Sequence, residues 1–189
     1  MKEITMNKSY FYLDMKTHEL EVPFTGRNRR VRVLLPKGYA EDTERTYPVV
    51  YFHDGQNVLY SKESFSGHSW KVIPTIKRNP DISKMIVVAI NNDGMERMHE
   101  YAAWKYSETS IPGVQFGGKG ILYAEFVMDV VKPFIDKEYR TKSDKAHTAM
   151  IGSSLGGNIT QFMGLAYQDQ IGCLGVFSSA NWLHQDAFD

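Results

Sequence analysis

The sequence predicts an α/β fold in which helices cover both faces of a mostly parallel β-sheet. The first observation is a set of short runs that are almost wholly apolar, which is typical of strands covered on both sides. The second is that segments with helical periodicity lie between these runs. The third is a serine flanked by glycines where one run meets a helical segment. The apolar runs span residues 48–53, 85–90, 146–152 and 173–178.

The other elements are expected from periodicity. Two strands of the antiparallel type precede the apolar runs, at residues 9–15 and 29–36, and the second alternates as RVRVLLP. In the longest helical segment, apolar residues recur at helical spacing, so one stripe faces a core. Pro133 lies inside this segment and should kink or divide the helix. The helices are expected over residues 70–79, 121–139 and 155–167.

Composition indicates one globular domain, placed at residues 1–189. Lys plus Arg and Asp plus Glu number 22 each, so no net charge favours nucleic acid or an anionic membrane as a partner. The first residues, MKEITMNKSYFYLDM, hold no apolar segment of a secretion signal, and no apolar run reaches the roughly 18 residues of a membrane span. We therefore expect a soluble, cytoplasmic protein. The single cysteine, Cys173, excludes an internal disulfide bond.

The serine of the third observation stands in the pattern Gly152-x-Ser154-x-Gly156. A serine at a sharp turn between strand and helix is a nucleophile elbow, and glycines two residues away on each side let strand and helix pack closely. Ser154 is therefore the candidate catalytic nucleophile. Ser153 is out of frame because the residues two positions from it are not glycine. The alternative is that both serines only cap the helix.

A serine nucleophile needs donors for the negative charge that develops on the substrate oxygen. One donor is expected to be the backbone amide of Leu155, at the helix N-terminus. The other is expected in the loop His53-Asp54-Gly55-Gln56 after the run PVVYFH, where Gly55 lets the chain turn and the amide of Gln56 points at the same spot. Only that amide, not the Gln56 side chain, is given a role. The alternative is an ordinary turn.

Five ordered motifs extend the pattern over nearly the whole chain: YPVVYFHDGQNVL, IVVAINNDGMERMHEYAAW, EFVMDVVKPFIDKEYRT, IGSSLGGN and LGVFSSANW. With them the chain resembles the Putative esterase family of α/β-hydrolases, which includes esterase D-like, feruloyl esterase-like and enterochelin esterase-like enzymes. The resemblance implies hydrolysis of carboxylic esters through an acyl-enzyme on Ser154, with the amides of Gln56 and Leu155 as oxyanion hole and without a cofactor.

The sequence departs from this family after the serine. In the family order the triad acid and histidine follow the nucleophile on loops after the last strands, and only one expected strand follows Ser154 before Asp189. We therefore expect a C-terminally incomplete domain that lacks its last two strands and is inactive or nearly so alone. Asp186 and His184 are weak substitutes for the triad acid and histidine. No spacing of histidines and carboxylates predicts a metal site.

Residues 91–120 form a long, aromatic-rich connection on the side of the sheet where a substrate pocket is expected. Two interpretations stay open for its aromatic side chains. They line an acyl or alcohol pocket, or they cover the core. The residues concerned are Tyr101, Trp104, Tyr106 and Phe116.

The expected function is that of a serine carboxylesterase acting on a small or medium acyl ester. An acyltransferase is an alternative, because it uses the same elbow but passes the acyl group to an alcohol. A catalytically incompetent fragment, or a binding module on a hydrolase scaffold, is a second alternative of a different class. The expected partner is a small-molecule ester, and a homo-oligomer is considered.

Overall fold

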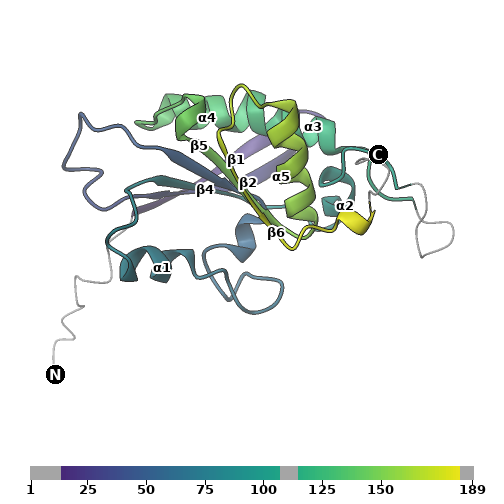
Figure 1. Ribbon diagram of the computed structural model, residues 1–189, viewed down its shortest axis with the longest axis horizontal. Coiled ribbons are helices and arrows are strands. Elements are labelled where there is room, and N and C mark those ends of the chain that lie inside the picture. The colour runs from purple at the N-terminus through teal and green to yellow at the C-terminus, as the bar shows by residue number, and fades with distance from the viewer. Residues whose placement is uncertain (1–13, 107–114, 184–189) are drawn as a thin grey trace.

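The computed structural model describes residues 14–106 and 115–183 and contains a six-stranded sheet (Figure 1). Its strand order is β1-β2-β4-β3-β5-β6. The four inner and C-terminal strands β4, β3, β5 and β6 run parallel, and β1 and β2 are antiparallel to their neighbours. The strands are β1 Asp14–Val22, β2 Arg27–Leu35, β3 Val49–Phe52, β4 Ile86–Ile90, β5 Thr148–Ser153 and β6 Cys173–Phe177.

The first strand, predicted over residues 9–15, is confirmed at residues 14 and 15, and it continues to Val22 beyond its predicted end. Strand β1 starts at Asp14 and runs to Val22, whereas residues 9–13 of the prediction lie outside the described part of the chain. Most side chains of β1 are exposed or half-buried, as in an antiparallel strand with little apolar burial. The strand is held by nine paired positions along β2. The other five strands lie within two residues of their expected positions.

Helices cover both faces of the sheet, as the apolar runs predicted. In Figure 1 the helices α3, α4 and α5 lie above the sheet and α1 lies below it. The chain order of the main helical segments is α1 Val72–Arg78, α2 Arg97–Glu100, α3 Gly120–Glu125, η3 Phe126–Val131, α4 Lys132–Glu138 and α5 Leu155–Ala166. Three short 3₁₀ segments also occur among the described residues: η2 Gly55–Asn57, η4 Lys145–His147 and η5 Asn181–Leu183.

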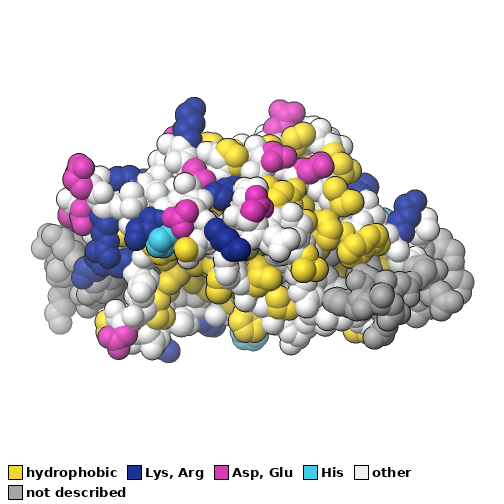
Figure 2. Space-filling model, turned by 45° about the horizontal axis from the view of Figure 1, so that its top comes forward, with side chains coloured by type: hydrophobic (Ala, Val, Ile, Leu, Met, Phe, Trp, Pro, Cys, Tyr) yellow, Lys and Arg dark blue, Asp and Glu magenta, His cyan; other side chains and the backbone are white. Residues whose placement is uncertain are grey.

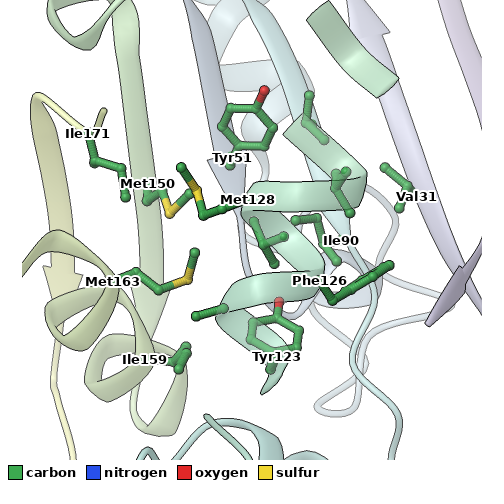
Figure 3. Close-up of a cluster of buried hydrophobic side chains, with 14 of the residues drawn as sticks. Val31, Tyr51, Ile90, Tyr123, Phe126, Met128, Met150, Ile159, Met163 and Ile171 are labelled. Carbon is green, nitrogen blue, oxygen red and sulfur yellow. The ribbon is translucent and has the colours of Figure 1, made fainter. Parts of the chain in front are cut away.

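Alternation along the strands divides the buried side chains into two cores. Tyr51 faces the larger core with Ile90 and Met150, where Tyr123 and Ile159 of the helices meet them (Figure 3). The next residue of β3 points to the opposite face. The smaller core lies between the sheet and α1 and contains Leu34, Phe52, Val58, Leu59, Val87 and Ala89.

Pro133 does not interrupt the long helix: residues 120–138 are helical throughout, and the expected division takes the form of a change from the π-helical segment η3 to α4. The segment η3 before it is a π-helix, in which the amide of Lys132 donates to the carbonyl of Val127 five residues back. Proline has no amide hydrogen and its ring crowds the carbonyl four residues earlier. Because the wider turn spreads the preceding carbonyls, Pro133 enters at the start of α4 without breaking the chain direction.

The last strand of the described sheet, β6, pairs only with β5 among these residues. Its side chains are half-buried or exposed: Leu174 is 42% exposed and Phe177 is 56% exposed. Figure 2 shows hydrophobic side chains in patches between charged ones on the face where the upper helices come forward. Within residues 14–106 and 115–183, no helix is long and apolar enough to cross a membrane.

Candidate active site

Ser154 is the one residue between the end of β5 and the start of α5, and its backbone conformation is rare for a residue with a side chain. Its φ is 57° and its ψ is −125°, and the residue is exposed. Such a conformation persists only where neighbours hold it. The amide of Ser154 donates to the carbonyl of Phe177 at 2.9 Å, and its own carbonyl accepts from the amides of Gly157 and Asn158 at 2.9 and 3.2 Å.

The two glycines of the pattern stand where strand and helix come closest. A Cβ at Gly152 would lie 2.0 Å from the carbonyl oxygen of Gly156, so any side chain there would clash with backbone. A Cβ at Gly156 would lie 3.1 Å from the carboxylate of Asp54. The first glycine therefore sets the contact between β5 and α5, and the second lets the loop after β3 approach the start of α5.

That loop leaves the sheet beside Ser154. Strands β3 and β5 are parallel neighbours with Phe52 opposite Ile151, and the amide of His53 donates to the carbonyl of Ile151 at 3.0 Å. The sharp turn lies at Asp54, whose φ of 56° and ψ of 45° are left-handed. Gly55 is required for another reason than the expected turn. A Cβ there would lie 2.6 Å from the backbone of Ala89 in β4.

Two backbone amides are free at this end of the sheet. The amides of Gln56 and Leu155 donate to no acceptor among the residues described. Leu155 is the first residue of α5, so its amide belongs to the positive end of the helix dipole. The loop and the elbow therefore each contain an amide without an acceptor in the described part of the chain, and their role as an oxyanion hole stays a prediction.

The carboxylate of Asp54 is almost fully buried and is bound by a cation. The guanidinium of Arg97 donates to it twice, through Nε at 2.7 Å and Nη2 at 2.8 Å, and the side-chain amide of Asn92 donates to Oδ1. Burial lowers the pKa of Arg97, but the hydrogen bond and the charge of Asp54 raise it by more. The amide of Asp54 donates to the hydroxyl of Tyr101 at 3.0 Å. All polar groups of Asp54 that face the protein interior are thus paired.

His53 is fully buried and lies away from solvent. Its Nδ1 shares a hydrogen bond of 2.9 Å with the hydroxyl of Tyr123, whereas Nε2 has no partner in the described part of the chain. The pKa of His53 is lowered to about 4, mainly because burial disfavours the charged imidazole. The negative charge of Asp54 raises this pKa, and the positive charge of Arg97 lowers it further. The imidazole is therefore neutral at pH 7 and helps to order the loop.

Comparison with known proteins decides the family. The model of the family described as "Putative esterase" matches residues 23–188. The chain belongs to this family. The esterase-family chain is 26% identical over 160 residues to "Uncharacterized protein YbbA" of Bacillus subtilis, covering 85% of this chain and 60% of the relative. It is also 26% identical over 175 residues to an "Endo-1,4-beta-xylanase/feruloyl esterase" of Xylanibacter ruminicola. This match covers 87% of this chain and 21% of the relative.

Solved structures show that the fold of this esterase-family chain is that of the α/β-hydrolases. An IroE-like serine hydrolase from Shewanella oneidensis superposes with a TM-score of 0.75 at 22% identity, covering 93% of this chain and 54% of the other. A ferulic acid esterase superposes with a TM-score of 0.65 at 24% identity, and the match covers 89% of this chain and 60% of the esterase. The enterobactin and salmochelin hydrolase IroE superposes with a TM-score of 0.69 at 14% sequence identity, and the match covers 94% of this chain and 66% of IroE. The chain thus spans about half to two thirds of these structures.

The aromatic residues expected to line a pocket fall into two groups. Tyr101 and Tyr106 are buried, and Phe116 packs against the core and against Tyr106. Trp104 is 51% exposed and stands edge-on to Phe162 of α5, with 5.6 Å between ring centroids. Covering the core thus describes the first three in this structure, and lining a pocket stays a prediction for Trp104.

No side chain of the described residues hydrogen-bonds the hydroxyl of Ser154. The substitutes suggested for the triad, His184 and Asp186, lie outside the residues that the structure describes. The remaining described histidines with hydrogen bonds use them elsewhere: His18 contacts Tyr139, His99 contacts the carbonyl of Gly117 and His147 contacts Asp144. Within the described ranges, no three groups of the metal-binding types come together.

Sequence analysis missed Arg97 and Asn92, which reach the loop after β3 from the segment that follows β4. It also gave the Gln56 side chain no role, whereas Oε1 of Gln56 accepts from the amide of Asn92 at 3.0 Å. Parallel strands end at one edge of a sheet, and polar residues directly after β3 and β4 were the available signal. Their pairing depends on side-chain directions that a sequence pattern does not specify.

Proposed function

We propose that the chain carries the nucleophile and oxyanion hole of a serine carboxylesterase. The observation that supports this most is the exposed Ser154, held at φ 57° at the turn from β5 to α5, with the amides of Leu155 and Gln56 unpaired within the described residues. Membership of the Putative esterase family supports the same reaction class. The chain covers 60% or less of the two curated relatives, so the activity of a whole protein is part of the proposal.

In the proposed reaction, the hydroxyl oxygen of Ser154 attacks the carbonyl carbon of an ester and gives up its proton to a base. The carbonyl oxygen gains negative charge, which the amides of Leu155 and Gln56 stabilise. The carbon–oxygen bond to the alcohol then breaks, and the alcohol leaves with a proton. Water hydrolyses the acyl-serine and releases the carboxylic acid. The base is assigned to no described residue.

The proposed substrate is a small-molecule ester with a small or medium acyl group. Aromatic side chains lie near the first two turns of α5 and at the end of β6: Phe177 packs at 6.4 Å against Trp70, and the exposed Trp104 contacts Phe162 of α5. Such rings offer apolar contact surface to an acyl or alcohol group. A relative with a feruloyl esterase name and an enterobactin hydrolase of similar fold are consistent with aromatic esters.

Covalent labelling tests the assignment. The tests use a form of the protein that contains these residues and hydrolyses p-nitrophenyl acetate. It is treated with a fluorophosphonate and separately with p-nitrophenyl acetate, and the modified residue is located by peptide mapping. We expect one modified serine, Ser154, and no labelling of Ser154→Ala. Ser153→Ala is the matched control, since it removes the neighbouring hydroxyl but leaves the elbow frame. Labelling that persists in Ser154→Ala and disappears in Ser153→Ala would refute the proposal.

The same labelled chain separates hydrolysis from acyl transfer. An esterase releases the acetyl group to water at a rate that an added alcohol changes little. If the acetyl group passes mainly to an added alcohol at low concentration, the reaction is acyl transfer instead. A chain that is never labelled at Ser154 acts as a scaffold and not as an acyl-enzyme.

A further inference from the structure

The loop after β3 is held by contacts from a segment that does not itself reach Ser154. Asp54 has a left-handed backbone, which costs free energy in a residue with a side chain and persists only when its surroundings fix it. Gln56, whose free amide is one of the two proposed donors, lies two residues later. Any rotation at Asp54 would therefore swing the Gln56 amide away from its position.

Asp54 is fixed at three points. Arg97 grips its carboxylate through two nitrogens at 2.7 and 2.8 Å, a fork geometry that sets the plane of the carboxylate as well as its position. Asn92 donates to Oδ1 of the same carboxylate, and the hydroxyl of Tyr101 accepts from the Asp54 amide. Arg97 is itself placed over the ring of Tyr101, 5.1 Å from its centroid.

Asn92 also holds the other end of the turn. Its backbone amide donates to Oε1 of Gln56 at 3.0 Å, so one residue binds both Asp54 and Gln56. Gly55 between them is pressed against the backbone of Ala89, which prevents the turn from retreating toward β4. The turn is therefore fixed on both sides of Gly55 by the chain that follows β4.

We infer that Arg97 and Asn92 are positioning residues that hold the Gln56 amide in the oxyanion hole by clamping Asp54 and the Gln56 side chain. The inference rests on the proposed function, because it assumes that the Gln56 amide acts on the substrate oxygen. Neither residue touches substrate.

Stability alone does not account for the arrangement. A buried ion pair contributes little net stability, since apolar residues of similar volume often serve as well. The carboxylate of Asp54 also lies against the start of α5, 3.1 Å from the position of a Cβ on Gly156. The clamp therefore sets the loop relative to the elbow, which is the relation that the two donors require.

The test compares Arg97→Lys, Arg97→Gln and Asn92→Ala with a matched control, Arg27→Gln. Arg27 also pairs with an aspartate, Asp93 at 2.8 Å, but does not contact the loop. The rate constant of fluorophosphonate labelling and the kcat and KM for p-nitrophenyl acetate are measured. We expect both Arg97 variants to label and to turn over about tenfold to a hundredfold more slowly, with KM little changed, because loss of an oxyanion donor lowers kcat. Arg27→Gln should remain within about twofold.

Arg97→Lys is informative because it keeps the positive charge but cannot donate to both oxygens of the Asp54 carboxylate through two fixed nitrogens. If Arg97→Lys restores the wild-type rate, or if all Arg97 and Asn92 variants label normally, the clamp is refuted. A loss that appears only as a higher KM would also refute it.

Hydrogen exchange gives a readout that does not depend on activity. The amide of Asn57 donates to the carbonyl of Asp54 at 2.7 Å and reports on the turn directly. We expect faster exchange at this amide in Arg97→Gln and unchanged exchange in the middle of α5. If Ser154→Ala retains the measured activity, the proposed function fails by itself, whereas unchanged exchange at Asn57 in Arg97→Gln overturns the clamp by itself.

Discussion

Two regions flank Ser154, and they are held in opposite ways. The loop after β3 is buried and its charged group is paired: the Asp54 side chain is 3% exposed and bound by Arg97. The chain at and after β6 is open, with Phe177 56% and Trp182 72% exposed. Both regions contact the elbow, one through Gly156 and one through the bond from the Ser154 amide to Phe177. The difference teaches that the β3 side of the site is fixed by a buried ion pair, whereas the β6 side is fixed by uncharged hydrogen bonds to α5. On that side the hydroxyl of Ser179 bonds to the side chain of Asn158, and the side-chain amide of Asn158 donates to the carbonyl of Ala180.

The largest expected effect is at Gly152, in the elbow between the two regions, where β5 and α5 come closest. Gly152→Ala would place a Cβ 2.0 Å from the Gly156 carbonyl oxygen, where backbone must move. We expect a loss of at least about 4 kcal/mol in the free energy of unfolding, a large part of the total for a chain of this size. Urea unfolding measures it. Gly94→Ala is the control, because no atom lies within 4 Å of a Cβ there, and a loss of similar size in both variants would contradict this account.

The next effect tests the polar side of the comparison. Glu100 is fully buried at the end of α2, and Arg29 binds it through two bonds at 2.8 and 2.9 Å. Glu100→Ala leaves the Arg29 charge buried without its partner, so we expect a loss of about 3 kcal/mol in unfolding free energy. Glu96→Ala removes a half-exposed partner of Lys119 and should cost less than about 1 kcal/mol. Equal losses of unfolding free energy in the two variants would show that burial of the ion pair does not determine the cost of breaking it.

Acid should weaken the buried loop through His53. Its pKa is about 4 in the folded chain and about 6.5 when unfolded, so the unfolded chain binds more protons in the window between these values. The free energy of unfolding should therefore fall by about 2 kcal/mol from pH 7 to pH 5. His53→Gln should remove this fall, and His68→Gln, at an exposed position, should keep it. Chemical denaturation at the two pH values tests this; an unchanged fall in His53→Gln would contradict it.

The smallest expected effect on stability lies at the open side. Phe177→Lys changes a side chain that is 56% exposed and contacts Trp70 at the sheet edge, so unfolding free energy should change by about 1 kcal/mol or less. We expect it to reduce self-association, since unpaired apolar edges pair with other chains and an inserted lysine opposes this. Size-exclusion chromatography across a concentration series measures it. A wild-type chain that stays monomeric at all concentrations would contradict the expected association through β6.

The fold was largely predictable, because apolar runs and glycine spacing are local signals. The position of Ser154 between β5 and α5 follows from three residues, Gly152, Ser154 and Gly156. The end of the first strand was not predictable, because β1 is held by hairpin pairing with β2 and few of its side chains are buried.

The candidate site was predictable only in its backbone. The amides of Leu155 and Gln56 were named from the positions of the strand ends, but the reason for Gly55 was not, since contact with Ala89 depends on how β4 passes the loop. The pairing of Asp54 with Arg97 joins residues 43 positions apart. No local spacing rule covers such a pair, and many carboxylates in the sequence are equally available to it.

The π-helical segment η3 changes what the apolar stripe of this helix means. Tyr123, Val127, Val131 and Ile135 are all fully buried and follow one another at intervals of four. In a regular α-helix each such step overshoots a full turn by about 40°, so the last side chain would have drifted well off the sheet. The wider turn of residues Phe126–Val131 rotates the chain back and cancels most of that drift. The π-helical segment thus keeps four side chains spaced at four residues on the face that packs against the sheet.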